Sequence, residues 1–220
     1  QRLLFDDAGR VTGIEVLQHG QMRQFHARRE VILSAGAVQS PLLLQRSGLA
    51  DGALLQELGL AVRCHLPAVG KNLQDHLCAS FYYRAQKPTL NALFGTLAGK
   101  AWLALRYLAT RKGPFAMSVN QAGGFVRANP EAERPNIQLY FNPLSYRIPN
   151  DRRQGLQPEP YPGFLIALSA CRPKSRGEVR LASPDMAAEP LIRPNYLSAD
   201  RDIVEALEGM RLIRRLAGTA

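Results

Sequence analysis

Four small residues follow a short apolar segment near residue 30, and this order of residue types can bind a ligand. The run Glu30-Val31-Ile32-Leu33 predicts a strand buried on both faces, and Ser34-Ala35-Gly36-Ala37 follows it directly. Small residues at the carboxyl end of such a strand let a ligand approach the backbone, and ligands bind at this edge of open α/β sheets. Ser40-Pro41 then predicts a helix N-cap and first helical position. A plain strand-turn-helix packing unit would show the same pattern.

The histidines and cysteines have no spacing that suits a metal or a redox pair. No two of the four histidines are spaced as metal ligands, and the three cysteines form no CxxC pair. We therefore expect no metal site and no disulfide framework, and a reducing compartment fits best. The residues concerned are His19, His26, His65, His76, Cys64, Cys78 and Cys171.

Composition and charge exclude several classes of protein. The 220 residues are 46% hydrophobic and 21% charged, which excludes a disordered chain, a collagen and a coiled coil. The net charge of +10 would suit an anionic partner, but no run of five basic residues exists, so we expect the basic side chains to be scattered over solvated faces. A basic nucleic-acid-binding module has only this charge in its favour, because no recognition-helix pattern accompanies it.

Alternating and apolar runs predict two structural regions. Residues 2–27 predict a three-stranded antiparallel meander, with turns at Asp6 to Gly9 and at His19-Gly20. Asp51 is expected to cap a helix over 53–58, and 60–64 to form a strand. After about residue 78 the pattern predicts a second, largely antiparallel sheet. Its expected strands begin near Phe81, Gly123, Asn136, Phe164 and Glu178, residues 142–163 are expected to form a long irregular loop, and 203–216 a helix.

Residues 91–111 predict one amphipathic helix with an apolar stripe. Phe94, Leu97, Ala101, Leu105 and Leu108 recur at spacings of three and four residues. A basic amphipathic helix of this kind can lie on a membrane surface. More often such a stripe packs on its own protein, and we expect that here. No apolar run approaches the roughly 20 residues that a membrane-spanning helix needs, and no signal peptide leads the chain.

Three motifs in order resemble those of the glucose-methanol-choline (GMC) oxidoreductases. The segment from Gly36 to Leu49 resembles the second signature of that family, although Ala50 stands where a glycine is usual. Val69-Gly70-Lys71-Asn72-Leu73-Gln74-Asp75-His76 resembles its VGxNLQDH segment, and Arg172 to Leu181 resembles RPxSRGxVRL. Pro190 to Leu197 fits the strand and loop that follow. The three matches span nearly the whole chain.

The resemblance implies an FAD-dependent enzyme of the choline dehydrogenase-like branch that oxidises an alcohol to an aldehyde or ketone. The implied fold is mixed α/β and α+β: part of a three-layer FAD-binding domain beside a substrate domain on an antiparallel sheet. Residues 1–78 would belong to the FAD-binding domain and 79–196 to the substrate domain. Residues 197–220 would form a helix leading back toward the FAD-binding domain.

The run of small residues at 34–37, taken together with the resemblance, leads to a hypothesis about binding residues. Ser34, Ala35 and Gly36 would contact the ADP part of FAD through their backbone, with the helix start at Ser40 nearby. Asn72, Asp75 and His76 would shape a loop near the flavin. Such a site requires Val31 to Gly36 to lie at a parallel sheet edge. We assign Arg172 and Arg176 a structural role in a loop.

The family's GxGxxG motif does not occur here, nor does its C-terminal segment with the catalytic His. We therefore expect a central fragment without a catalytic residue of its own, because none of the four histidines matches that role. The fragment alone would be inactive, and an inactive remnant without FAD is the alternative.

The substrate position falls near Asn120 and Gln121. By our alignment, choline-oxidising relatives carry a Glu where Gln121 stands, so a neutral side chain here disfavours choline and favours an uncharged alcohol. The electron acceptor would be oxygen, a quinone or another carrier. The expected location is cytoplasmic, with possible peripheral contact at the inner membrane.

Overall fold

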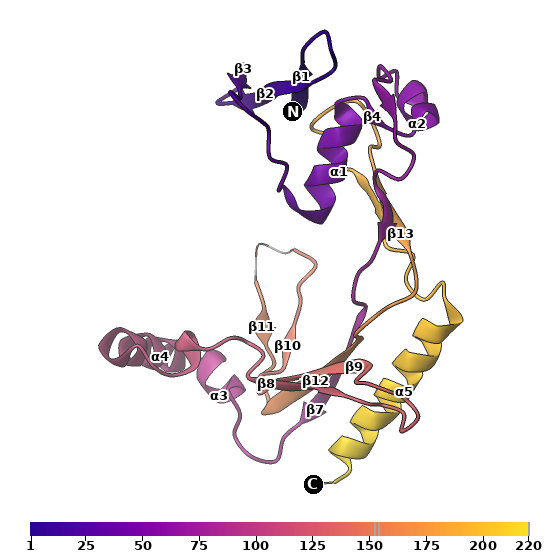
Figure 1. Cartoon of the computed structure of the whole chain (residues 1–220). Helices are drawn as coiled ribbons and strands as arrows, with labels where there is room; N and C mark the ends of the chain where they lie inside the picture. Colours follow the sequence, from indigo (N-terminus) through magenta and orange to yellow (C-terminus); the bar gives the residue numbers. More distant parts are fainter. Residues whose placement is uncertain (152, 154, 220) are drawn as a thin grey trace. The chain divides into compact units, whose positions relative to one another are not determined.

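The computed structural model describes residues 1–151, 153 and 155–219. They form two compact units (Figure 1). The first unit comprises residues 1–75 and 174–199, and the second comprises 76–173 and the segment from Asp200 onward. The sheets within them are mostly antiparallel, which confirms the predicted mixed α/β fold class.

The first unit begins with the predicted antiparallel meander. Its strands are β1 (Arg2–Phe5), β2 (Val11–Gln18) and β3 (Gln21–His26), in the order β1-β2-β3. The backbone nitrogen of Leu3 donates to Ser47 Oγ at 2.9 Å, which joins β1 to the end of helix α1 (Gly36–Arg46).

The strand expected at 30–33 does not form, and this prediction is wrong. These residues pair with no strand of the described chain, and Ile32 is 79% exposed. A buried parallel strand requires a neighbouring strand on each side to receive its backbone hydrogen bonds. The described residues place none beside 30–33, so the segment runs extended into α1 without a sheet edge.

Helix α1 starts earlier than the Ser40-Pro41 signal predicts. It begins at Gly36, so Pro41 lies inside the helix and Ser40 is not the N-cap. Pro41 has no N–H to donate to the carbonyl of Ala37, one turn back. The helix ends at Arg46, with Ser47 as the C-cap and Gly48 following at a φ of 82°.

A short helix and a two-stranded sheet follow α1. The side chain of Asp51 accepts from the backbone nitrogen of Ala53 and caps α2 (Gly52–Glu57), as predicted. Strand β4 (Leu49–Ala50) pairs in parallel with β5 (Cys64–His65). The strand expected over 60–64 is therefore reduced to its last residue and the one after it.

The third sheet of the first unit brings distant segments together. Its order is β14-β13-β6, all antiparallel, with β6 at Lys71–Leu73, β13 at Gly177–Arg180 and β14 at Leu191–Arg193. Leu42 of α1 packs in one buried cluster with Val179 and Leu181. Residues 174–199, most of which were expected in the substrate domain, lie in one unit with residues 1–75, because β13 buries its apolar side chains against α1.

The second unit is built on the predicted antiparallel sheet, in the order β7-β12-β9-β8. These strands are β7 (Cys78–Arg84), β8 (Ala122–Val126), β9 (Ile137–Asn142) and β12 (Gly163–Ala170). Helix α5 (Asp200–Ala217) packs on this sheet through Gly209, where an added Cβ would lie 3.3 Å from Ile137 and 3.2 Å from Leu168. The helix expected to lead back to the FAD-binding domain thus covers a face of the second sheet.

The loop expected at 142–163 contains a small hairpin, β10 (Tyr146–Arg147) with β11 (Gln157–Pro158). Buried Asn91 ties it down, because Asn91 Nδ2 donates to the carbonyls of Ser145 at 2.8 Å and Glu159 at 3.0 Å. Two of the hairpin loop's residues lie outside the described chain.

The helix expected over 91–111 is split in two. Its parts are α3 (Asn91–Phe94) and α4 (Leu97–Thr110), and the Thr96 hydroxyl caps α4 by accepting from Gly99 N at 3.0 Å. The 3-10 turn η1 (Pro114–Ala116) follows. In the described chain the apolar stripe of α4 is not packed on the protein, since Leu97 is 87% exposed. None of the described helices is both long and apolar enough to cross a membrane.

Candidate functional site

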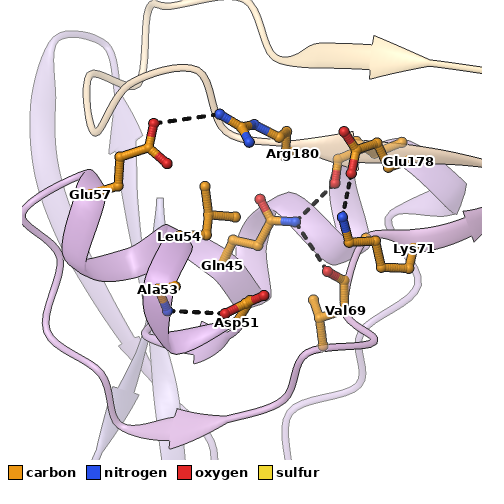
Figure 2. Close-up of a pocket in the computed structure, with 11 residues that line it drawn as sticks. Gln45, Asp51, Ala53, Leu54, Glu57, Val69, Lys71, Glu178 and Arg180 are labelled. Carbon is orange, nitrogen blue, oxygen red and sulfur yellow. Dashed lines mark hydrogen bonds and ion pairs between the residues drawn. The ribbon is translucent and has the colours of Figure 1, made fainter.

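The three sequence motifs of the first unit meet at one buried side chain, Gln45 (Figure 2). Its Nε2 donates to the carbonyl of Val179 at 2.9 Å and to that of Val69 at 3.4 Å. Its Oε1 accepts from the backbone nitrogen of Leu181 at 2.8 Å. One amide group therefore joins α1, the 69–76 loop and β13, and satisfies backbone groups that would otherwise be buried without partners.

Gly70 sits against the same strand and has no room for a side chain. Its carbonyl accepts from Val179 N at 2.7 Å, and its φ is 87°. A Cβ added to Gly70 would lie 2.1 Å from the Val179 carbonyl oxygen and 2.4 Å from Gln45 Nε2. The glycine of this motif is thus required for the close approach of the 69–76 loop to β13.

A cavity of about 230 Å³ lies beside this junction. Four of its five charged side chains form ion pairs, Lys71 with Glu178 and Arg180 with Glu57 at 3.7 Å, and the fifth, Asp51, caps α2 (Figure 2). The hydrogen bond from Lys71, opposed in part by desolvation, holds the pKa of Glu178 below its usual range. The lining residues are Gln45, Asp51, Ala53, Leu54, Glu57, Val69, Gly70, Lys71, Glu178, Val179 and Arg180.

A second, larger cavity of about 690 Å³ is also lined by Lys71 and Glu178. Asn72 and Asn195 both line it and both adopt the left-handed conformation, with φ values of 61° and 57°. Asn195 Nδ2 donates to the Arg176 carbonyl at 3.1 Å. The wall of the second cavity is therefore formed in part by the 69–76 loop and by the loop that follows β14.

Asp75 and Tyr196 connect the same two loops at their far ends. The Tyr196 hydroxyl donates to Asp75 Oδ2. This hydrogen bond is the main cause of a raised pKa at Tyr196, since it favours the protonated phenol. Asp75, predicted to shape the loop near a flavin, here fixes the loop to residues that follow β14.

The predicted cofactor residues of the first unit fall into two groups. Ser34, Ala35 and Gly36 are exposed at the start of α1, and Ser40 is half-buried one turn later. Asn72 and Asp75 lie in the 69–76 loop. Each group is close in sequence. The residues at 34–40 line neither of the two cavities described above.

The remaining predicted residues belong to the second unit. His76 is exposed just before β7. Asn120 is exposed, and Gln121 precedes β8 with its backbone nitrogen donating to the Phe141 carbonyl at 3.0 Å. Gln121 thus sits beside the end of β9. In the described residues no cluster of three metal-ligating side chains occurs.

Sequence reasoning missed Gln45 and Tyr196, which make the key contacts in the first unit. Gln45 stands directly after Leu42-Leu43-Leu44 in a helix with a buried face. A single amide in that position signals a buried hydrogen-bonding group. No comparable signal marks Tyr196, because its partner is 121 residues away.

The start of α1 has the features that an anionic group of a dinucleotide needs. The N-cap Ala35 makes no side-chain cap and the first turn, all of it described, holds no acidic residue. The first-turn N–H groups carry the positive end of the helix dipole. An ideal Cβ on Gly36, at a φ of 80°, meets no other atom within 4 Å, so a ligand has open access to this backbone. These residues fit the ADP part of FAD.

Comparison with known families matches two stretches of the chain, which include both parts of the first unit and the segment from Asp200 onward. The N-terminal GMC oxidoreductase model matches residues 1–78, and the C-terminal GMC oxidoreductase model matches 173–220. The chain belongs to the GMC oxidoreductase family. The resemblance found in the three motifs is thereby confirmed, and the part matched by the C-terminal model contains no histidine.

Similar proteins include enzymes named as choline dehydrogenases. The chain is 36% identical to oxygen-dependent choline dehydrogenase 1 of Chromohalobacter salexigens over 94% of its own length and 36% of the relative's. It is 37% identical to an uncharacterized GMC-type oxidoreductase of Mycobacterium tuberculosis, covering 96% of this chain and 38% of that one. The chain thus spans just over a third of the length of these relatives.

Solved structures share the fold. A formate oxidase variant of Aspergillus oryzae studied for FAD modification superposes with a TM-score of 0.84 at 24% identity, over 98% of this chain and 42% of that chain. Pyridoxine 4-oxidase from Mesorbium loti gives a TM-score of 0.74 at 24% identity, over 97% and 37%. These likenesses show the fold of flavin-dependent GMC oxidoreductases.

Proposed function

We propose that this chain is part of an FAD-dependent oxidoreductase that oxidises the CH–OH group of an alcohol to an aldehyde or ketone. The observation that carries the proposal is the junction at Gln45, where three motifs of the GMC family meet in one unit. FAD, when bound, supplies the acceptor for the hydride that leaves the alcohol carbon.

The residues at 34–36 are proposed to bind the ADP part through backbone groups. Their support is the exposed, uncapped start of α1 and the open space around Gly36. A sheet edge does not support them, because 30–33 forms no strand in the described chain. Asn72, Asp75 and His76 are proposed to hold the 69–76 loop in shape near the flavin rather than to react.

The test is FAD affinity in the intact enzyme with Gly36→Val. Gly9→Val is a matched control, since Gly9 has the same φ of 80° and also no atom within 4 Å of an ideal Cβ. Valine strains the backbone at both positions, so a difference in FAD affinity between the two variants reports the loss of contact with the ligand. The dissociation constant of FAD, measured by flavin fluorescence, should rise at least about tenfold for Gly36→Val and should not rise for Gly9→Val. Equal FAD affinity in both variants would refute the assignment.

The chain by itself is proposed not to catalyse, because the GxGxxG motif and the catalytic His segment are absent from its sequence. Titration of the purified chain with FAD, followed through the visible flavin bands, tests whether it binds the cofactor. Saturable binding without turnover of alcohols would support a binding fragment, and no binding would support the inactive-remnant alternative. Oxygen, a quinone or another carrier would accept the electrons.

The proposed substrate is an uncharged alcohol bound near Asn120 and Gln121. The support is the neutral Gln121, which offers no charge to a quaternary ammonium group. Choline is the second candidate, favoured by the 36% identity to a relative named a choline dehydrogenase. An intact enzyme that turns over choline faster than aliphatic or aromatic alcohols would decide for choline.

A further inference from the structure

Helix α4 of the second unit presents an apolar face that no described residue covers. Leu97, Trp102, Leu105 and Leu108 are 87%, 51%, 67% and 65% exposed. Leu103, on the opposite face, is 1% exposed and anchors the helix. In Figure 1, α4 lies beside α3 at one end of the second unit. An apolar face of this extent on an exposed helix indicates an interaction surface.

Basic side chains border this apolar face. At 3.6 residues per turn, Lys100 falls along one edge of the face and Arg106 along the other, and Arg111 follows as the C-cap of α4. The Arg106 guanidinium lies 5.3 Å from the Trp102 ring centroid. The arrangement of an apolar centre between two basic borders is that of a helix lying flat in a membrane interface.

The charge bias extends well beyond the helix. Residues 76–130 contain no Asp or Glu at all. The same stretch carries seven basic residues: Arg84, Lys87, Lys100, Arg106, Arg111, Lys112 and Arg127. This segment of the second unit therefore has a one-signed field that attracts an anionic surface.

We propose that the apolar face of α4 and its basic borders dock on a bilayer containing anionic phospholipid. The leucines and Trp102 would enter the boundary between headgroups and acyl chains, and the basic borders would contact lipid phosphates. A second copy of the chain suits this surface poorly. A two-fold interface would set the same basic borders against each other, with no acidic residue in 76–130 to compensate.

The chain carries its own probe, because Trp102 is its one tryptophan. Vesicles of phosphatidylcholine alone and of phosphatidylcholine with phosphatidylglycerol are compared by co-sedimentation and by Trp emission. The chain should bind only the anionic vesicles, with a blue-shifted emission, and added salt should weaken binding. Binding without a change in emission, equal binding to neutral vesicles, or no binding to the anionic ones would each overturn the proposal.

Matched variants separate the apolar and basic contributions. Leu105→Gln with Leu108→Gln should lower the partition coefficient at least about tenfold, because two exposed leucines leave the bilayer. Ile148→Gln, a change at a side chain 68% exposed in the same unit, should leave it unchanged. Lys100→Gln with Arg106→Gln should lower it about tenfold, whereas Arg134→Gln with Arg211→Gln removes the same charge away from α4 and should lower it far less.

Sedimentation velocity tests the alternative that a second copy of the chain occupies this face. A dimer that forms without lipid and is lost in Leu105→Gln would assign the face to self-association and overturn the membrane proposal. A monomer in both proteins supports it. Circular dichroism of each variant confirms that the exposed substitutions leave the fold intact.

Discussion

The Nε2 of Gln45 lies 2.9 Å from the carbonyl oxygen of Val179, although 134 residues separate them in the chain. The Oε1 of the same side chain accepts a hydrogen bond from the backbone N–H of Leu181. A buried helix residue therefore completes the hydrogen bonding of a strand from another motif. This side chain therefore links all three motifs of the first unit.

Replacing Gln45 with Leu should destabilise the first unit by about 2–4 kcal/mol, because the Val179 carbonyl and the Leu181 N–H lose their partner inside the core. Urea unfolding followed by circular dichroism measures the loss. Gln56→Leu on the exposed side of α2 is the control, with an expected change within about 0.5 kcal/mol. Equal stabilities of the two variants would show that the amide contributes nothing specific.

Gly70→Ala should cost at least about 2–3 kcal/mol, because the new Cβ meets the Val179 carbonyl oxygen in addition to the left-handed strain. Gly59→Ala isolates the strain, since Gly59 has a φ of 67° and nothing within 4 Å, and should cost about 1 kcal/mol. Thermal or urea unfolding compares the two. A Gly70→Ala cost no larger than that of Gly59→Ala would contradict the close approach.

The Lys71–Glu178 pair should stabilise the first unit only above acidic pH. The pKa of the Glu178 carboxyl is lowered in the folded state. The stabilisation is therefore present above the unfolded pKa of about 4.3 and is lost as pH falls through the folded pKa of Glu178. A double-mutant cycle with Lys71→Met and Glu178→Gln should give about 0.2–1 kcal/mol at pH 7, because the lysine end is exposed. The coupling should vanish near pH 2; a coupling unchanged there would exclude the ion pair as its source.

Tyr196 should titrate above the ordinary tyrosine value of about 10. The raised pKa means that the Tyr196–Asp75 hydrogen bond contributes fully below that value and is lost as pH rises through the higher folded pKa. The ultraviolet difference titration between the native chain and Tyr196→Phe isolates this one phenol. In an Asp75→Asn background the midpoint should move down toward 10. No movement would assign the shift to burial instead.

Gln121→Glu in the intact enzyme should raise kcat/KM for choline relative to a neutral alcohol by about tenfold, because a carboxylate attracts the quaternary ammonium group. Gln86→Glu, an exposed change of equal charge in the second unit, serves as the control. If both variants shift the ratio equally, the effect comes from net charge, and Gln121 does not contact the substrate.

Local patterns in the sequence predicted the elements whose hydrogen bonds are local. The meander follows from alternation and from turns at Gly9 and Gly20, and the α2 cap follows from Asp51. In the second unit the individual strands follow from their apolar runs, whereas the pairing of β7 with β12 joins residues 78–84 to 163–170 and follows from no local pattern. The motifs led correctly to the family.

The elements that depend on distant partners were not predictable in this way. The apolar run at 30–33 has the composition of a buried strand, yet composition cannot supply the neighbouring strands that it needs. The split of the helix expected over 91–111 is a different case, because its cause is local: the Thr96 hydroxyl forms a new N-cap, which apolar periodicity does not reveal. The role of Gln45 emerges only when β13 is placed against α1.

The division of the first unit into two stretches of chain sets an order on synthesis. Residues 1–75 leave the ribosome well before 174–199, and everything between them must be translated first. Until then, the partners of Gln45 on β13 do not yet exist, and Leu42 lacks Val179 and Leu181 to pack against. The nascent N-terminal stretch therefore exposes apolar surface until residues 174–199 have been translated. Chaperone binding would protect it during this stage.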